Sequence, residues 1–250
     1  MTSVVNSIFS EFNKILQAFV SHDDNDLDSE LTHYTDLNGL IGIVKTGTIY
    51  AGNLIAMNDA SEFVYAKKLV LDLIGKNHGL KKTHEIARII SCIKFRLESL
   101  NEPPFAFVTS FTSQRDATTH WQGYSGSSGV ALHFDARALS EQAKQIGAYL
   151  SCCKYVENQQ QDFINSLFSE LLTKCQTTLD SGFSSDEDHL KWLAEVTLYN
   201  LAKAAPIIKS KEFSHEQEWR CVYYLPWDGY SKYPDLSEIE FLNRSGIVTG

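Results

Sequence analysis

The chain has 250 residues, 43% of them hydrophobic, and a formal net charge of −9. This composition is ordinary for a globular protein and supplies enough apolar side chains for a sizeable core, as one large domain or two small ones. A protein that neutralises the phosphates of duplex DNA usually carries a basic face, and none is evident here. The composition therefore disfavours duplex DNA as a partner.

The cysteines point to a reducing compartment. Their number is odd, and no two of them form a Cys-x-x-Cys pair. A secreted disulfide framework and a zinc knuckle are both unsupported, and reduced thiols fit a cytoplasmic protein. No metal is expected. There is neither a basic leader nor an apolar run of about 18 residues, so we expect no signal peptide and no membrane span.

The chain begins with a predicted amphipathic helix. Apolar residues recur at helical spacing over residues 1–20, and the acidic stretch 21–30 then breaks the pattern. We expect residues 1–29 to form a helix and an acidic linker, followed by a single domain over residues 30–250.

This domain opens with a strand, a short helix and a second strand. Residues 31–34 read as the first strand, Thr35 or Asp36 can cap the helix, Gly47 fits its C-terminal cap, and residues 48–51 read as the second strand. Four residues at i, i+3, i+4 and i+7 predict a buried helical stripe: Leu37, Leu40, Ile41 and Val44.

The remaining elements alternate irregularly. The predicted helices begin at the segment 57–63, with Asn58 or Asp59 as cap, and cover residues 83–100, 160–178 and 188–203. The predicted strands are 105–113, 129–134, 151–156, 215–227 and 238–242. This order favours an α+β fold with a largely antiparallel or mixed sheet over a doubly wound fold.

The common catalytic motifs are missing. The sequence has no G-x-G-x-x-G, no P-loop and no H-E-x-x-H. The stretch GYSGSSG at 123–129 fails the G-x-S-x-G pattern because Ser127 replaces the second glycine, so we interpret it as a flexible turn.

Three polar and aromatic stretches beside predicted strand ends remain. In the first, THYT, His33 and Tyr34 point to opposite faces of a strand. His33 can donate a hydrogen bond to a ligand hydroxyl, although a lone histidine is more often a packing residue.

The second stretch runs from Thr109 to Gly129, where Trp121 and Tyr124 follow a polar strand end. Their rings can stack on a flat heterocycle or simply fill the core under a loop.

The third stretch is HEQEWR. Glu216, Glu218 and Arg220 share one strand face, while Trp219 and the alternate residues after it claim the other face for the core. The charged face is either solvated or salt-bridged, or it places a carboxylate at a pocket edge where an oxocarbenium-like cation develops.

Together these stretches resemble a bacterial domain family of unknown function. The resemblance rests on HYT, GLIGIVKTGTIY, MNDASE, SFTS, HWQGYSGSSGVALHF and EQEWRCVYY, and covers roughly residues 30 to 225.

The stretch LTHYTDLNGLIGIVKTGTIY is also similar to the opening of NAD-dependent ADP-ribosyltransferases of the nucleic-acid-modifying toxin kind. This looser resemblance implies a split, mixed or antiparallel sheet with flanking helices that holds NAD as substrate. Glu218 would be the catalytic glutamate, His33 would orient NAD through its nicotinamide ribose, and Tyr50 or Tyr124 would stack on nicotinamide. Further NAD contacts implied by the resemblance are Tyr34, Thr35, Asn58, Ser110, Trp121, Glu216 and Arg220.

The resemblance implies an ADP-ribosyltransferase acting on a nucleic acid or protein, as a bacterial toxin or antiphage defence effector, with an antitoxin or regulatory protein as a further partner. With water as acceptor it would be an NAD glycohydrolase. The alternative is a non-catalytic nucleotide- or partner-binding module on the same fold.

Overall fold

The structure is a computed structural model. It describes residues 2–21, 27–54, 61–76, 83–99, 106–124, 128–224, 242–244 and 247–249. The predicted cap at Asn58 or Asp59, half of the acidic stretch 21–30 and the centre of the Gly-Ser turn lie outside these ranges. No helix in the described ranges is both long and apolar enough to span a membrane.

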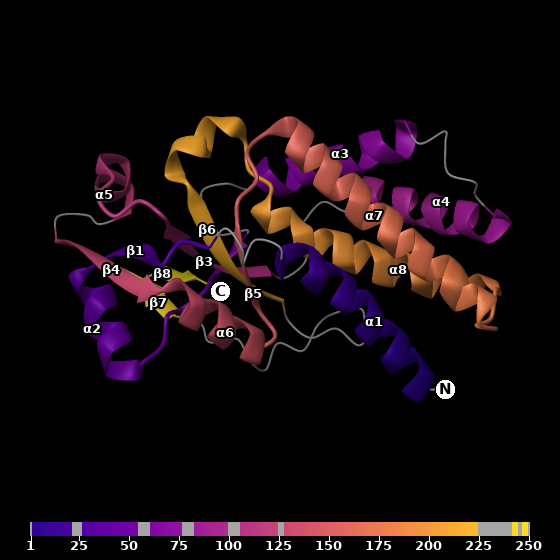
Figure 1. Cartoon of the computed structure of the whole chain (residues 1–250), viewed down its shortest axis with the longest axis horizontal. Coiled ribbons are helices and arrows are strands. Elements are labelled where there is room, and N and C mark those ends of the chain that lie inside the picture. Colours follow the sequence, from indigo (N-terminus) through magenta and orange to yellow (C-terminus); the bar gives the residue numbers. More distant parts are fainter. Residues whose placement is uncertain are drawn as a thin grey trace.

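The centre of the fold is a six-stranded antiparallel sheet, whose main strand order is β4-β1-β3-β6-β5 (Figure 1). The sixth strand, β2, pairs with β3 beside β1. The strands are β1 (Glu30–Asp36), β2 (Gly52–Asn53), β3 (Ala106–Thr112), β4 (Gly129–Asp135), β5 (Tyr149–Cys152) and β6 (Glu218–Tyr224). A separate hairpin consists of β7 (Leu242–Arg244) and β8 (Ile247–Thr249). The expected α+β class with a largely antiparallel sheet is therefore confirmed.

The register of the three central strands decides which side chains share a face. Thr112 on β3 lies opposite Thr32 on β1 and opposite Glu218 on β6. Paired residues of antiparallel strands point to the same side of a sheet, and neighbours along a strand point to opposite sides. Glu218 therefore shares its face with Thr32 and Thr112, whereas His33 points to the other face.

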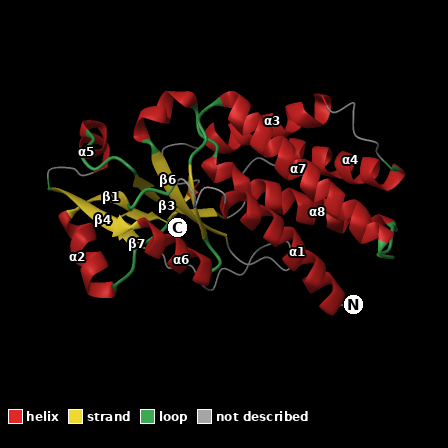
Figure 2. Cartoon of the chain, in the orientation of Figure 1, coloured by secondary structure: helices red, strands yellow, loops and turns green. Residues whose placement is uncertain are grey.

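A layer of helices covers the Glu218 face toward one end of the sheet (Figure 2). It contains α1 (Thr2–Ser21), α3 (Ser61–Lys76), α4 (His84–Ser99), α7 (Glu157–Asp180) and α8 (Glu187–Ala204). The isoleucine repeat of α4 is buried there as predicted, and so is one face of α1, including Phe12 and Leu16. The apolar periodicity of these helices thus creates the main core against Val108 and Val222 of the sheet.

The opposite face of the sheet packs on α6 (Ala136–Gln145). A second, smaller core forms there around Leu31, Phe111, Leu150 and Trp219. The two cores explain why β6 buries both of its faces, the charged one as well as the aromatic one.

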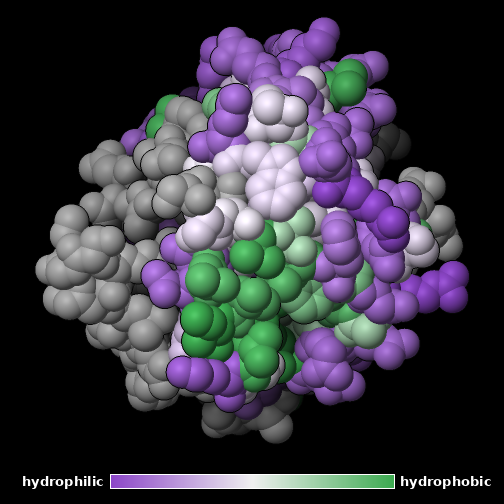
Figure 3. Space-filling model, turned by 90° about the vertical axis from the view of Figure 1, so that its left-hand side faces the viewer, coloured by the Kyte–Doolittle hydropathy of each residue, from purple (hydrophilic) through white to green (hydrophobic). Residues whose placement is uncertain are grey.

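The predicted burial of α2 (Leu37–Thr46) is wrong. Asp36 caps this helix by accepting a hydrogen bond from Gly39 N at 2.7 Å, and Gly47 ends it with φ of 67°, as expected. However, none of its residues is buried, and Val44 is 74% exposed. Figure 3 shows a continuous apolar patch on this side of the molecule. The helix contacts β1 and β4 at the border of the sheet, where the described chain provides no second layer to cover its stripe.

Several strand boundaries also differ from prediction. No strand forms over residues 48–51, and the short β2 begins only at Gly52. Of the predicted strand 151–156, only Ser151 and Cys152 are in β5, because the chain turns into the parallel bridge between Lys154 and Ile208. The predicted strand 215–227 begins at Glu218 because η4 (Lys211–Glu216) occupies its start. Most of the predicted strand 238–242 lies outside the described ranges.

Candidate functional site

The site is organised around the start of β6. The 3-10 helix η4 ends at Glu216, and Gln217 follows with φ of 43°, in the left-handed region that non-glycine residues rarely adopt. This turn leads directly into Glu218, the first residue of the strand. As a result, the carboxylates of Glu216 and Glu218 both reach the same lysine, Lys209.

Four charged side chains form one buried network, which we name the charge cluster: Lys209, Glu216, Glu218 and Arg220. Lys209 Nζ lies 2.5 Å from Glu216 Oε2 and 2.8 Å from Glu218 Oε2. Arg220 Nε lies 3.0 Å from Glu218 Oε1. Lys209, Glu218 and Arg220 are all buried. Two cations thus balance two carboxylates, which is the condition under which charges are tolerated in a protein interior.

Backbone groups and neighbouring side chains fix this cluster in place. Arg220 Nη1 donates to the carbonyl of Pro206 at 2.6 Å, and Gln160 Nε2 donates to the carbonyl of Lys209 at 2.7 Å. The backbone N–H of Glu218 donates to the hydroxyl of Tyr155 at 3.0 Å. The charged groups are therefore held by Pro206, by Gln160 of α7 and by Tyr155 just before α7.

The network keeps Glu218 ionised. Burial alone would raise the pKa of this carboxyl group, but the charges of Arg220 and Lys209 and their hydrogen bonds outweigh burial and lower the pKa to about 2. Burial likewise opposes the charged form of Lys209, and the carboxylate of Glu218 outweighs it, so that the pKa of Lys209 is raised. Glu218 and Lys209 are consequently both charged at neutral pH.

A pH dependence of stability follows from Glu218. Its pKa is lower in the folded chain than in the unfolded chain, so the stabilisation is complete above about pH 4.5 and is lost as the pH falls toward 2. Between pH 5 and pH 3, we expect the free energy of unfolding to fall by about 2 kcal/mol more in the wild type than in Glu218→Gln. Urea titrations at both pH values measure this difference, and equal acid sensitivity of the two proteins would contradict it.

An aromatic group lies on the same face of the sheet. Tyr34, two residues after Thr32, stacks on His120 with ring centroids 5.1 Å apart, and Trp121 meets the Tyr34 ring edge-on at 4.9 Å. Both partners come from α5 (Thr118–Tyr124). The Tyr34 hydroxyl accepts a hydrogen bond from Ala117 N at 3.1 Å, which ties the start of α5 to β1.

His120 connects this aromatic group to the charge cluster electrostatically. Burial lowers the pKa of His120, and the carboxylates of Glu216 and Glu218 act in the opposite direction. The two acidic side chains are thus close enough to influence the ring. A buried imidazole, two aromatic rings and an ionised carboxylate are features of sites that bind heterocyclic ligands.

The prediction that His33 and Glu218 line one cleft is wrong. His33 Nδ1 is bonded to the carbonyl oxygen of Ser110 at 2.9 Å, and its ring lies 5.6 Å from that of Phe111, in the smaller core. The pairing register places Thr32, not His33, across from Thr112 and Glu218. A difference of one residue moves a side chain to the opposite face of a sheet.

The other residues predicted to contact NAD do not all lie on one face of the sheet. Ser110 lies opposite Arg220 in the register, and its Oγ is buried without a hydrogen-bond partner among the described residues. Thr35 alternates with Tyr34 and so shares the face of His33. The side chain of Tyr50 is exposed, and its carbonyl oxygen accepts a hydrogen bond from Thr109 at 3.3 Å. Asn58 and the side chain of Tyr124 lie outside the described part of the structure.

Sequence reasoning missed Lys209 and His120. Lys209 lies in an irregular segment after η3 (Ala205–Ile207), so no periodicity connects it to Glu218. His120 directly precedes Trp121, and the sequence around it draws attention only to its aromatic rings. Within the described ranges, no group of three or more His, Cys, Asp or Glu side chains is placed to hold a metal ion.

One comparison with known proteins matches the part of the chain that carries this site to a family model. Residues 120–221 match the model of a family described as a protein of unknown function (DUF2971). The expected resemblance to a family of unknown function is thus confirmed, and the matched range contains His120 and the whole charge cluster. Comparisons with the curated proteins and with the solved structures found no match.

Proposed function

We propose that the chain is an NAD-dependent ADP-ribosyltransferase that binds its substrate on the Glu218 face of the sheet. The observation that supports this most is the ionised carboxylate of Glu218, fixed at the start of a strand on the face that also carries Tyr34, His120 and Trp121. His33 has no part in this proposal, because it faces the other side.

The chemistry needs a negative charge near the ribose. When the bond between C1′ and the nicotinamide nitrogen breaks, its electron pair leaves with nicotinamide and positive charge develops on the ribose. A preorganised carboxylate stabilises that charge without reorganisation. Glu216 can retain Lys209 while Glu218 binds a ribose hydroxyl, and a nucleobase, a protein side chain or water then attacks C1′ and loses its proton.

A specific observation favours a second candidate function. Both carboxylate oxygens of Glu218 are already bonded, one to Arg220 and the other to Lys209. If the cluster keeps these bonds in the presence of a nucleotide, the chain is a non-catalytic nucleotide-binding module.

Two measurements on the purified full chain test the proposal. We expect nicotinamide, detected by chromatography, to be released from NAD either by the protein alone or after addition of a cell extract. We also expect NAD to raise the melting temperature, since 100 Kd of ligand adds about 2.7 kcal/mol of stability. A rise in melting temperature without nicotinamide release would overturn the enzyme proposal in favour of the binding module. If NAD causes neither nicotinamide release nor a rise in melting temperature, both the enzyme proposal and the binding-module alternative are overturned.

A further inference from the structure

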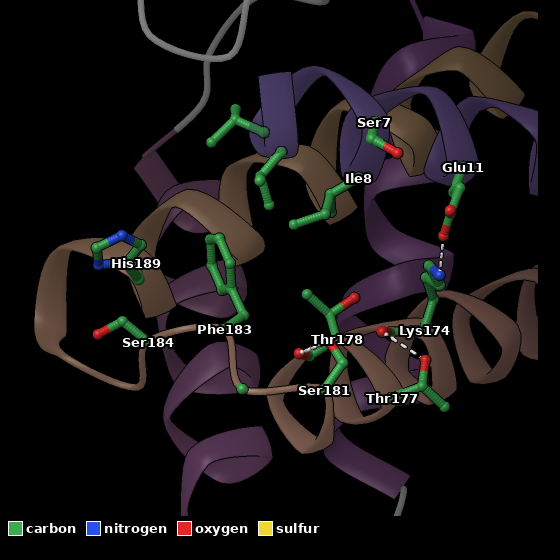
Figure 4. A pocket seen from close by; sticks show the side chains of 13 residues that line it. Ser7, Ile8, Glu11, Lys174, Thr177, Thr178, Ser181, Phe183, Ser184 and His189 are labelled. Carbon is green, nitrogen blue, oxygen red and sulfur yellow. Dashed lines mark hydrogen bonds and ion pairs between the residues drawn. The ribbon is translucent and has the colours of Figure 1, made fainter. Parts of the chain in front are cut away.

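A solvent-open cavity lies in the helical layer, away from the charge cluster. Its volume is about 730 Å³, within the range of ligand-binding pockets. It is bordered by the first half of α1, the end of α7 and the turn into α8 (Figure 4). Nothing in the proposed function uses this cavity.

The wall of the cavity is largely apolar on one side. Val5 and Ile8 come from α1, and Phe183 comes from the turn, where its ring also meets His189 and Trp192. Gly182, with φ of 93°, allows the chain to reverse just before Phe183. Figure 4 shows Phe183 and Ile8 on either side of the space above Thr178.

One buried hydroxyl group in the wall is unusual. Thr178 is 4% exposed, and its Oγ1 has no hydrogen-bond partner among the described residues. Two other threonines of α7 behave differently: Thr177 donates to the carbonyl of Lys174 at 3.0 Å, and Thr173 donates to the carbonyl of Ser169 at 2.9 Å. Buried hydroxyl groups normally have a partner. Thr178 Oγ1 is itself enclosed, and it becomes available to a molecule in the cavity when χ1 moves to the other rotamer that a helical threonine adopts.

The charged groups at the rim are already bonded to neighbouring side chains. Lys174 forms an ion pair with Glu11 of α1, and His189 Nδ1 lies 2.7 Å from Asp186 Oδ1. The rim therefore offers no free ammonium group to an anionic ligand, and its carboxylates already accept hydrogen bonds from Lys174, His189 and Ser184. A neutral molecule fits this rim best.

We propose that this cavity binds a small neutral molecule that has an apolar body and one hydroxyl or carbonyl group, which pairs with Thr178. The apolar body packs between α1 and Phe183. The ligand thereby bridges α1 and the turn between α7 and α8.

Two matched probes test the proposal on the full chain: 1-naphthalenemethanol, which has a hydroxyl group, and 1-methylnaphthalene, which lacks one. Binding is followed by NMR titration of the ¹⁵N-labelled protein. We expect both probes to shift the amide signals of Ile8, Thr178 and Phe183. We also expect Thr178→Val to weaken binding of the alcohol by about tenfold, the equivalent of one neutral hydrogen bond, and to leave the hydrocarbon unaffected.

The control variant is Thr177→Val, on the same turn of α7, whose hydroxyl group is already bonded to the helix backbone. We expect it to bind both probes as the wild type does. Thr178→Val should fold normally, because no hydrogen bond to a described residue is lost. Absence of saturable binding, signal shifts confined to other parts of the chain, or equal binding of the alcohol by Thr178→Val and wild type would each overturn the proposal.

Discussion

Replacing Lys209 by methionine is expected to lower the free energy of unfolding by about 3–5 kcal/mol. Methionine keeps most of the length and apolar surface of the side chain but removes the ammonium group. Glu216 and Glu218 then face each other with Arg220 as their remaining cation, and Glu218 stays buried. The large expected effect comes from the uncompensated negative charge, and a urea titration at pH 7 measures it.

Lys191 provides the matched control. Its Nζ lies 2.6 Å from Glu187 Oε1, as close as in the charge cluster, but both side chains are more than half exposed. We expect Lys191→Met to change the free energy of unfolding far less than Lys209→Met does, because solvent screens an exposed ion pair. Adding Glu218→Gln to Lys209→Met should recover part of the lost stability, since it removes one uncompensated charge. Equal effects of Lys209→Met and Lys191→Met would show that burial does not matter here.

Glu218→Gln is expected to reduce nicotinamide release from NAD by about 10²–10³-fold, mainly through kcat. Glutamine keeps the shape of the side chain but cannot stabilise positive charge on the ribose. The variant must first show a wild-type near-ultraviolet circular dichroism spectrum, so that a loss of activity is not a loss of folding.

His33→Gln is the control for this experiment. His33 lies on the opposite face of the sheet from Glu218, so its replacement should leave the rate of nicotinamide release unchanged. A folded Glu218→Gln variant with wild-type activity would exclude the proposed site. A loss in His33→Gln as large as in Glu218→Gln would contradict the assignment of the site to one face.

The sequence predicted well those elements whose periodicity reflects their own packing. The isoleucines of α4 are spaced for one buried face, and that face is buried. The same logic failed for α2, because the spacing of Leu37, Ile41 and Val44 shows that apolar side chains gather on one side of a helix but not that another layer covers them.

The sequence pattern predicted the arrangement of the site residues only within the single strand β6. Alternation along HEQEWR correctly placed Glu218 and Arg220 on one face. Whether His33 shares that face depends on how β1 pairs with β3, and this register is set by contacts between distant segments that no local pattern encodes. The same limit applies to Lys209, which joins Glu218 through the path of an irregular segment.

The position of α1 has a consequence for the order in which the chain folds during synthesis. Its apolar face, including Phe12 and Leu16, packs against α7 and α8, which are made long after it. The central pairing of β3 with β6 likewise joins segments far apart in the chain. Such non-local contacts slow folding, and apolar surface that waits for its partner is prone to aggregation. The helix α1 must therefore stay unassembled until α8 has emerged from the ribosome.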